Sequence, residues 1–129
     1  MNEVRILASI QHPCIVAYRE SYLEDAHLCI VMDYADDGDL YQKILHHQQH
    51  QTLFEEEDIW RYLVHMVRGL RELHRLKIFP RDMKSANVFL MQGGGAKLGD
   101  LNVSKVAKKG LLYTQTGTPY YASPEVWQD

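Results

Sequence analysis

Apolar positions recur along the chain with two periods, one typical of helices and one typical of strands. Residues 3–10 carry apolar side chains at helical spacing. We expect this helix to end before Pro13, because a residue that precedes proline disfavours the helical backbone. Residues 15–22 and 27–34 are rich in β-branched and aromatic side chains and flank a short polar turn. The pattern therefore predicts a helix end followed by an antiparallel hairpin.

A second helix is predicted after the turn residues at positions 35–38, with Asp39 as its N-cap. Its apolar side chains have helical spacing and are expected to be buried: Leu40, Ile44 and Leu45. The polar tract at residues 46–51 is predicted to be a solvated connection. If the tract were helical, His46 and His50 would meet and a metal site would be conceivable, but no acidic or cysteine ligand is interleaved.

A helix of about 20 residues is predicted next. Thr52 and Glu55 have the spacing of a capping box at its start, and the charges at its two ends complement the helix dipole. His65 and His74 lie on or near its apolar stripe, where a packed histidine is more frequent than a metal ligand. The stripe that we expect to face the core consists of Ile59, Leu63, Met66, Val67, Leu70 and Leu73.

A second hairpin is predicted in the last third of the sequence. The run Val88-Phe89-Leu90 is typical of a buried strand, the three glycines at 93–95 predict a turn, and residues 96–100 form the returning strand. Residues 101–121 show no sustained period and are predicted to form a long surface loop, a feature that is usually functional. The expected fold class is α+β.

Composition and charge narrow the function classes without selecting one. The 129 residues are 46% hydrophobic and 24% charged, as in an ordinary globular domain. A formal net charge of -3 offers no basic surface to DNA or RNA, so nucleic acid is not an expected partner. The sequence has no apolar run of the kind that a membrane span or a signal peptide requires. The expected location is therefore the cytoplasm, with cytoskeletal or nuclear association left open. Cys14 and Cys29 lack metal-site spacing and are expected to be buried, reduced thiols.

The segment before Val88 carries the clearest chemical signal. Asp82, Lys84 and Asn87 place an acid, a cation and an amide within six positions. Phosphoryl transfer uses these three types: the acid takes the proton of the attacking hydroxyl, the cation follows the migrating charge, and neutral oxygen helps to hold magnesium. A single Asp or Asn in a loop is most often a turn former, so the signal depends on the joint pattern.

Two more motifs follow the segment Arg81-Asp82-x-Lys84-x-x-Asn87, namely Gly99-Asp100 and Gly117-Thr118-Pro119-Tyr120-Tyr121-Ala122-Ser123-Pro124-Glu125. In this order the three motifs resemble, respectively, the catalytic loop, the magnesium-binding Asp motif and the Ala-Pro-Glu segment of protein kinases. Lys84 and the Gly-Thr-Pro-Tyr-Tyr run resemble the NIMA-related (Nek) serine/threonine kinases. The resemblance implies a partial protein-kinase-like fold. Residues 1–35 would be an N-lobe remnant, with a helix end, two strands and the hinge, and residues 36–129 would be the α-rich first half of the C-lobe through the activation loop.

The resemblance implies a role for each matching residue of the catalytic segment. Asp82 would accept the proton of the substrate hydroxyl, and Lys84 would lie beside the γ-phosphate of ATP. Asn87 and Asp100 would hold Mg2+ with hard oxygen ligands. The implied activity is that of a serine/threonine protein kinase, which transfers the γ-phosphate of ATP to Ser or Thr hydroxyls of protein substrates.

An ATP site is implied by the same resemblance. Met32 occupies the gatekeeper position, and backbone groups of Asp33 to Ala35 would bond the adenine edge. Asp39 could accept a hydrogen bond from the ribose hydroxyl, and Phe89 would form an apolar floor under the adenine.

Regulatory roles are implied for five further residues. Arg81 could pair with a phosphorylated activation loop, for which Thr114 is the best match to the family's site and Thr116 the second. Thr118 should help to shape the acceptor site. Glu3 matches a helix Glu that pairs with a strand Lys, which would lie upstream of residue 1.

Departures from the family bear on activity. Pro80 stands where the family has His, so imidazole hydrogen bonds and an amide donor are lost and coupling of the catalytic loop to Asp100 should weaken. Leu101-Asn102 replaces the usual Phe-Gly, a change expected to be mild because Leu remains apolar and Asn tolerates left-handed backbone angles. The Gly-rich loop and strand Lys of the family are not in the chain, which is therefore expected to be a fragment with negligible turnover alone.

The alternative hypothesis is a non-catalytic, pseudokinase-like or truncated scaffold. Pro80 favours it. The joint presence of the four catalytic candidates disfavours it, since a scaffold has no chemical need for all of them: Asp82, Lys84, Asn87 and Asp100.

Overall fold

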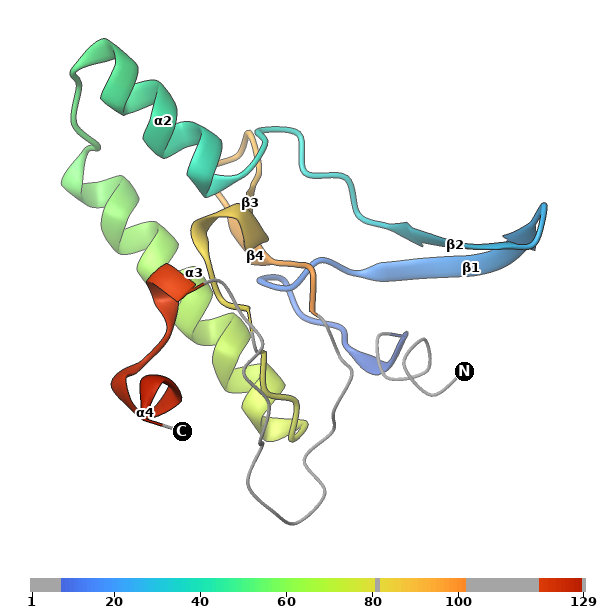
Figure 1. The fold of residues 1–129 in the computed structure, drawn as a ribbon. Coiled ribbons are helices and arrows are strands. Elements are labelled where there is room, and N and C mark those ends of the chain that lie inside the picture. Colours follow the sequence, from blue (N-terminus) through green and yellow to red (C-terminus); the bar gives the residue numbers. More distant parts are fainter. Residues whose placement is uncertain (1–7, 81, 102–118, 129) are drawn as a thin grey trace.

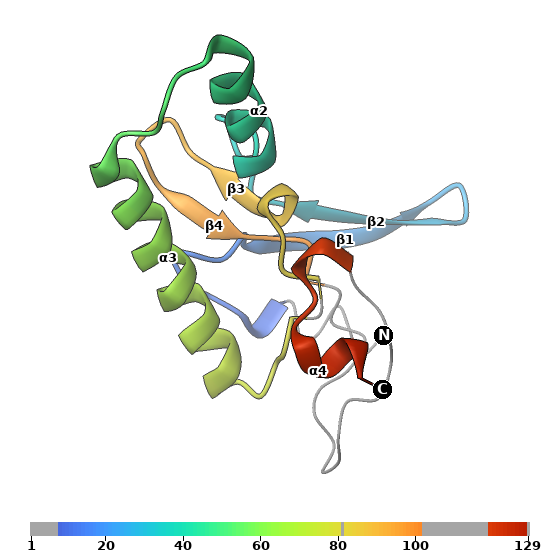
Figure 2. The same cartoon turned by 60° about the vertical axis from the view of Figure 1, so that its left-hand side comes forward.

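Two helices and two small hairpins make up most of the computed structural model, which describes residues 8–80, 82–101 and 119–128. Strands β1 (Tyr18–Glu24) and β2 (His27–Met32) form the first hairpin, and helices α2 (Leu40–His50) and α3 (Glu56–Arg75) follow. Strands β3 (Val88–Leu90) and β4 (Ala96–Leu98) form the second hairpin, which lies between α3 and the first hairpin (Figures 1 and 2). The single turns η1 (Ser85–Asn87) and η2 (Pro119–Tyr121) and the short helix α4 (Pro124–Trp127) complete the described elements. The predicted α+β content is confirmed.

The first hairpin forms as predicted, although its strands are shorter than expected. β1 and β2 pair antiparallel, and Asp25 and Ala26 between them have positive φ angles of 47° and 62°, as a tight two-residue hairpin turn requires. Ile15, which was predicted to begin the first strand, instead bridges Leu98 of β4 in parallel. Residues 14–16 therefore belong to the second hairpin, to which they add a short third strand.

The core lies where this three-stranded unit meets α3. Alternate residues of β3 and β4 point into it, and its members are almost fully buried: Val88, Leu90, Ala96, Leu98, Ile10, Ile15, Tyr62, Leu73 and Ile78. Gly69 lies at the closest approach, because a Cβ at this position would be 2.8 Å from the carbonyl oxygen of Cys14 and 2.9 Å from Leu98 Cδ1. The helix can pack this tightly against the strands only because residue 69 has no side chain.

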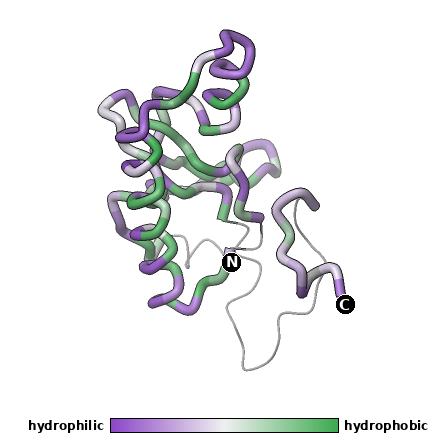
Figure 3. Tube along the Cα trace, turned by 90° about the vertical axis from the view of Figure 1, so that its left-hand side faces the viewer, coloured by the Kyte–Doolittle hydropathy of each residue, from purple (hydrophilic) through white to green (hydrophobic). Residues whose placement is uncertain are grey.

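Helix α3 has the predicted length and buries half of the predicted stripe. Leu73 is fully buried, and Met66 and Leu70 are partly buried against the core, as predicted. The helix spans 20 residues, and its buried residues are Tyr62, Gly69 and Leu73. Ile59, Leu63 and Val67, which were predicted to face the core, are 52%, 42% and 55% exposed. Apolar residues cover more than one side of this helix, so periodicity alone could not select the buried side. Figure 3 shows hydrophobic and hydrophilic residues alternating along its backbone. The strands pack where Gly69 allows the closest approach.

Helix α2 begins as predicted and ends later. Asp39 is the N-cap, and its carboxylate accepts a hydrogen bond from Gln42 N at 2.9 Å. The helix continues to His50 and is capped by Gln51 in the left-handed conformation, so the polar tract is a helix end and the prediction of a connection was wrong. The expected burial is found only in part: Leu40 packs against the core and Leu45 is half-buried, whereas Ile44 is 39% exposed.

The histidine and cysteine predictions are confirmed for His65 and Cys14, whereas His74, predicted to be packed, is exposed. The rings of His46 and His50 do meet, with centroids 4.2 Å apart, yet the described residues contain no cluster of three or more His, Cys, Asp or Glu that could hold a metal. His65 is a boundary residue, since its Nδ1 accepts a hydrogen bond from Ala96 N at 3.1 Å. Cys14 is a buried free thiol whose pKa is raised by burial, and Cys29 is free but only half-buried.

The predicted capping box at the start of α3 is wrong. The N-cap is Glu55, whose side chain makes no capping hydrogen bond. The Thr52 hydroxyl bonds to Nδ1 of His47 at 2.8 Å, and Thr52 N donates to the His47 carbonyl. Thr52 therefore closes the preceding helix, because α2 extends further than the sequence pattern suggests.

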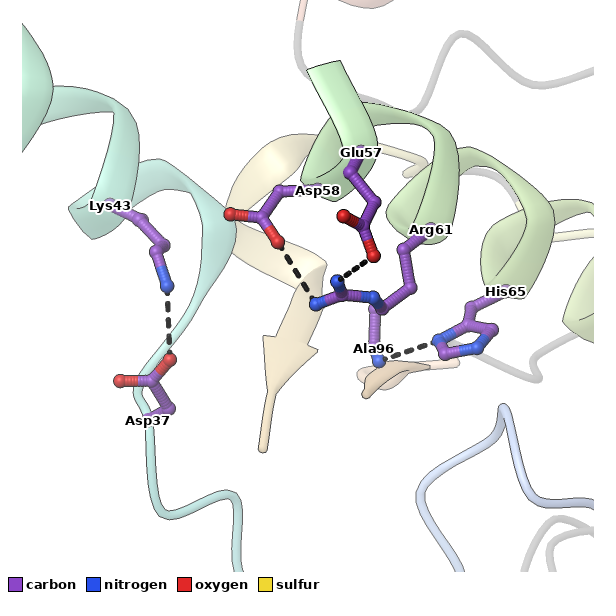
Figure 4. A network of polar contacts seen from close by, with 7 residues as sticks. All are labelled: Asp37, Lys43, Glu57, Asp58, Arg61, His65 and Ala96. Carbon is purple, nitrogen blue, oxygen red and sulfur yellow. Dashed lines mark hydrogen bonds and ion pairs between the residues drawn. The ribbon is translucent and has the colours of Figure 1, made fainter. Parts of the chain in front are cut away.

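Ion pairs lie near the N-terminal ends of both helices. Arg61 of α3 contacts Asp58 at 2.9 Å and Glu57 at 3.3 Å, and Lys43 of α2 contacts Asp37 at 3.2 Å. Figure 4 shows these pairs beside the hydrogen bond that joins α3 to the start of β4. Within the described ranges, no helix is both long enough and apolar enough to cross a membrane.

Replacing Gly69 with alanine tests the close contact of α3 with the strands. Alanine is the better helix former by about 1 kcal/mol, but overpacking of this kind costs about 1–3 kcal/mol or more. Because one clashing atom is a backbone oxygen, we expect Gly69→Ala to lower the free energy of unfolding by about 1–2 kcal/mol net, measured by urea denaturation.

Gly93→Ala is the matched control, since a Cβ there meets nothing within 4 Å. This variant should change the free energy of unfolding by less than about 0.5 kcal/mol. A Gly69→Ala protein as stable as the control variant would contradict the close packing.

Candidate functional site

The end of α3 directs the chain into the loop that carries the candidate catalytic residues. Lys77 adopts a left-handed φ of 62° and its N–H donates to His74, while Ile78 N donates to the Leu73 carbonyl at 2.9 Å. This pair of bonds is a Schellman motif, and the accompanying apolar contact is present because Ile78 and Leu73 are both buried. The helix therefore ends in a fixed geometry, and Phe79 and Pro80 follow at the border of the core.

The loop brings Asp82, Lys84 and Asn87 together, as their spacing predicts. Lys84 Nζ lies 2.7 Å from Asp82 Oδ2, and both side chains are about three-quarters buried, at 26% and 22% exposure. The Asn87 amide nitrogen donates to the backbone oxygen of Asp82 at 2.8 Å. Asn87 is itself buried, at the end of the η1 turn, so it fixes the path of the loop around the acid.

Asp100 is attached to the same loop through its neighbour. Gly99 N donates to the Asn87 carbonyl at 3.0 Å, which places the end of β4 beside the end of η1. The Asp100 side chain is exposed, and its backbone has a φ of 46°. The other non-glycine residues with positive φ in the described ranges lie at hairpin or helix ends: Asp25, Ala26, Gln51 and Lys77. Asp100 has no such explanation, and strained backbone of this kind is frequent at functional sites.

The chemistry of the donor set fits magnesium. The nitrogen of the Asn87 amide is committed to Asp82 O, which leaves the amide oxygen as the group that can act as a ligand. Asp100 adds an exposed carboxylate two residues after β4. Amide and carboxylate oxygens are the hard ligands that Mg2+ prefers, with water and phosphate oxygens completing its shell.

The second face of the β3–β4 hairpin carries the candidate adenine floor. Phe89 pairs with Lys97 across the hairpin and bridges Asp39 on its other side. A Cβ on Gly99 would lie 2.5 Å from Phe89 Cε2, so this glycine makes room for the ring. The structure thus brings the proposed ribose ligand, Asp39, and the proposed adenine floor, Phe89, onto neighbouring positions.

Asp33, at the end of β2, is held by a network that the sequence did not reveal. Its carboxylate contacts Lys97 Nζ at 3.0 Å, Arg19 Nε at 2.8 Å and Ala17 N at 3.3 Å. Burial raises the pKa of this carboxyl, but the hydrogen bonds from Lys97, Arg19 and Ala17 outweigh it and the pKa is lowered overall. In the sequence, the sign of this network is Lys97, a charged residue between the two apolar residues of β4.

Ser85 was also missed. It is buried within η1, and its hydroxyl lies 2.9 Å from the Tyr121 hydroxyl. This bond joins the catalytic loop to the segment after residue 118, a partner 36 positions away that no local pattern predicts.

The remaining candidates are placed as follows. Met32 is 49% exposed at the end of β2, and Ala35 is partly buried in the segment that follows. The regulatory candidates lie outside the described residues: Glu3, Arg81, Thr114, Thr116 and Thr118.

Comparison with known proteins agrees with this geometry. The family model described as protein kinase domain matches residues 1–129. The chain is 40% identical over 130 residues to serine/threonine-protein kinase Nek3 of Mus musculus, and 99% of the chain and 25% of that protein are covered. It is 43% identical over 131 residues to serine/threonine-protein kinase Nek5 of Mus musculus, with 99% of the chain and 21% of the relative covered. A probable serine/threonine-protein kinase nek2 of Dictyostelium discoideum is 38% identical over 131 residues, with coverage of 97% and 31%.

The chain spans about a quarter of the length of these relatives. The whole chain nevertheless lies within the matched domain. Among the described residues, printed contacts join the catalytic segment to Gly99 and to Tyr121, which belong to the other two motifs. The chain therefore belongs to the protein kinase family, and the resemblance to its NIMA-related branch is confirmed.

Proposed function

We propose that the protein is a serine/threonine protein kinase that transfers the γ-phosphate of ATP to Ser or Thr hydroxyls of protein substrates. The observation that carries this proposal is the joint placement of Asp82, Lys84 and Asn87 by the contacts at 2.7 Å and 2.8 Å. In the proposed organisation residues 1–35 are the N-lobe part and hinge, and residues 36–129 are the C-lobe part. The proposed location is the cytoplasm.

The proposed reaction assigns one task to each polar group of the loop. Asp82 accepts the proton of the substrate hydroxyl as that oxygen attacks the γ-phosphorus. Lys84, already paired with the same carboxylate, offers its charge to the transferred phosphoryl group. The oxygens of Asn87 and Asp100 would hold magnesium, which when bound supplies positive charge against the phosphate oxygens.

The nucleotide would lie against the second face of the β3–β4 hairpin. Phe89 offers an apolar surface to the adenine, and the Asp39 carboxylate accepts a hydrogen bond from the ribose hydroxyl. The N–H of Asp33 is already bonded to the Ala17 carbonyl, so the backbone groups proposed for the adenine edge are the Asp33 carbonyl and the groups up to Ala35. Met32 would border this pocket as the gatekeeper.

Regulation is proposed for the residues outside the described ranges. Arg81 would pair with an activation loop phosphorylated at Thr114 or Thr116. Thr118 would help to shape the acceptor site, and Glu3 would pair with a strand Lys.

A non-catalytic scaffold is the second candidate. The observation that favours it is Pro80, at the entry to the loop, where the family has a histidine. Under this hypothesis the kinase surface would bind partner proteins without phosphoryl transfer.

Asp82→Asn in the full-length protein separates the two candidates. The amide keeps the size of the carboxyl but cannot take the proton, so we expect kcat for phosphorylation of a Ser/Thr peptide to fall by about a hundredfold to ten-thousandfold. Asp25→Asn is the matched control, because Asp25 lies in the exposed β1–β2 turn and asparagine tolerates its positive φ. Full activity of Asp82→Asn would contradict the kinase proposal.

Pro80→His tests the departure from the family. Histidine restores an amide donor and imidazole hydrogen bonds beside the catalytic loop, so we expect kcat of the full-length protein to rise by about threefold or more. Pro13→His, in an exposed turn, controls for the substitution itself. Unchanged turnover in Pro80→His would remove the argument that this proline weakens the site.

A further inference from the structure

The segment that follows β2 is fastened to the second hairpin at its far end. Gly38 O accepts a hydrogen bond from Leu90 N at 2.9 Å, and Asp37 N donates to Leu90 O at 3.1 Å. The Asp36 carboxylate accepts from Gln92 N at 2.9 Å. Residues 36–38 therefore have fixed positions relative to the end of β3.

The near end of the same segment is fastened through Asp33. Its N–H donates to Ala17 O at 2.9 Å, and its carboxylate accepts from Ala17 N at 3.3 Å, so β2 stays attached beyond its last strand pair. The carboxylate also contacts Lys97 on one oxygen and Arg19 on the other. Between the two fastened ends lie only Tyr34 and Ala35.

Lys97 and Arg19 differ in their surroundings. The Lys97 side chain is 22% exposed and arises from the middle of β4, whereas the Arg19 side chain is 65% exposed on β1. Exposed ion pairs contribute little because water screens them, whereas breaking a shielded pair leaves a poorly compensated charge. Lys97 is also the strand partner of Phe89, so within the described residues the Lys97 contact is the one that joins Asp33 directly to the strand pair that carries Phe89.

We propose that Lys97 is a positioning residue for the nucleotide: by holding Asp33, it fixes the peptide groups of residues 34–35 at the distance from Phe89 that a purine base requires. Lys97 does not touch the nucleotide in this proposal. It acts through the carboxylate of Asp33 and thereby sets the affinity for the nucleoside triphosphate. The inference rests on the proposed kinase function and adds to it a residue that the motifs do not include.

Lys97→Met in the full-length protein removes the charge and keeps most of the side-chain volume. Arg19 and Ala17 N still contact Asp33, so the fold should persist. We expect the KM for ATP to rise about tenfold, which corresponds to roughly 1.4 kcal/mol, while kcat and the KM for the peptide change by less than about twofold. Lys97→Arg should restore the KM for ATP, because guanidinium keeps the ion pair.

Arg19→Met is the matched control, since it removes one positive charge from the same carboxylate on the exposed side. Its KM for ATP should change by less than about twofold. The inference is overturned if Lys97→Met leaves the KM for ATP unchanged, if Arg19→Met raises it equally, or if kcat and both KM values deteriorate together.

Two further outcomes are distinguishable. If Lys97→Met does not fold, as judged by its thermal midpoint, Asp33→Asn weakens the same contact from its other side with both cations retained. Because this change also weakens the Arg19 contact, its KM for ATP is compared with that of Arg19→Met. A tenfold rise in the KM for ATP then supports the proposal, and no rise overturns it. If the unsubstituted protein transfers no phosphate, the proposed function fails. If the unsubstituted protein is active and Lys97→Met has an unchanged KM for ATP, this inference alone is overturned.

Discussion

The contact of α3 with the backbone of residues 14–16 and with β4 is the constraint on which the rest of the structure depends. Gly69 removes the side chain at the crossing, so the Cys14 carbonyl and Leu98 can approach the helix. β4 pairs with β3 on one edge and with residues 14–16 on the other, through hydrogen bonds of 2.8 Å and 2.9 Å at Leu98. Segments far apart in sequence thus form one small sheet on the helix. The first hairpin and the candidate catalytic loop both continue from this sheet.

The alternation of side chains across this sheet separates stability from function. Val88 and Leu98 point into the core against α3, whereas their neighbours Phe89 and Lys97 point to the opposite face. A strand of three residues is enough for this division, because consecutive residues always face opposite sides. The same alternation explains why a lysine can occupy the middle of β4 at little cost, since its charge meets Asp33 on the face proposed for the nucleotide.

Local patterns predicted the elements, but tertiary partners could not be predicted from them. The two hairpins, the Asp39 cap and the length of α3 follow from turn chemistry and periodicity over a few residues. The buried face of α3 follows only in part: Met66, Leu70 and Leu73 pack as the periodicity predicts. The other half of the predicted stripe is exposed, because apolar residues lie on more than one side of the helix and the closest contact is at Gly69. For the site, the spacing of Asp82 to Asn87 predicted the cluster within the loop. The bond from Lys97 to Asp33 spans 64 positions and has no local signature.

The loop between α3 and β3 is held by polar bonds, some within the loop and others to segments later in the chain. Asn87 donates to Asp82 O and accepts from Gly99 N through its own carbonyl, while Ser85 bonds to Tyr121. Asn87 and Ser85 are the two buried polar residues of the described chain, and buried polar groups are costly unless they are paired. The hydrogen bonds that remove this cost also fix the path of the loop. The side chains that stabilise the turn therefore also set the positions of the Asp82 carboxylate and the Asn87 amide oxygen. Asn87 therefore has two roles at once, one through its nitrogen in the fold and one through its oxygen in the proposed chemistry.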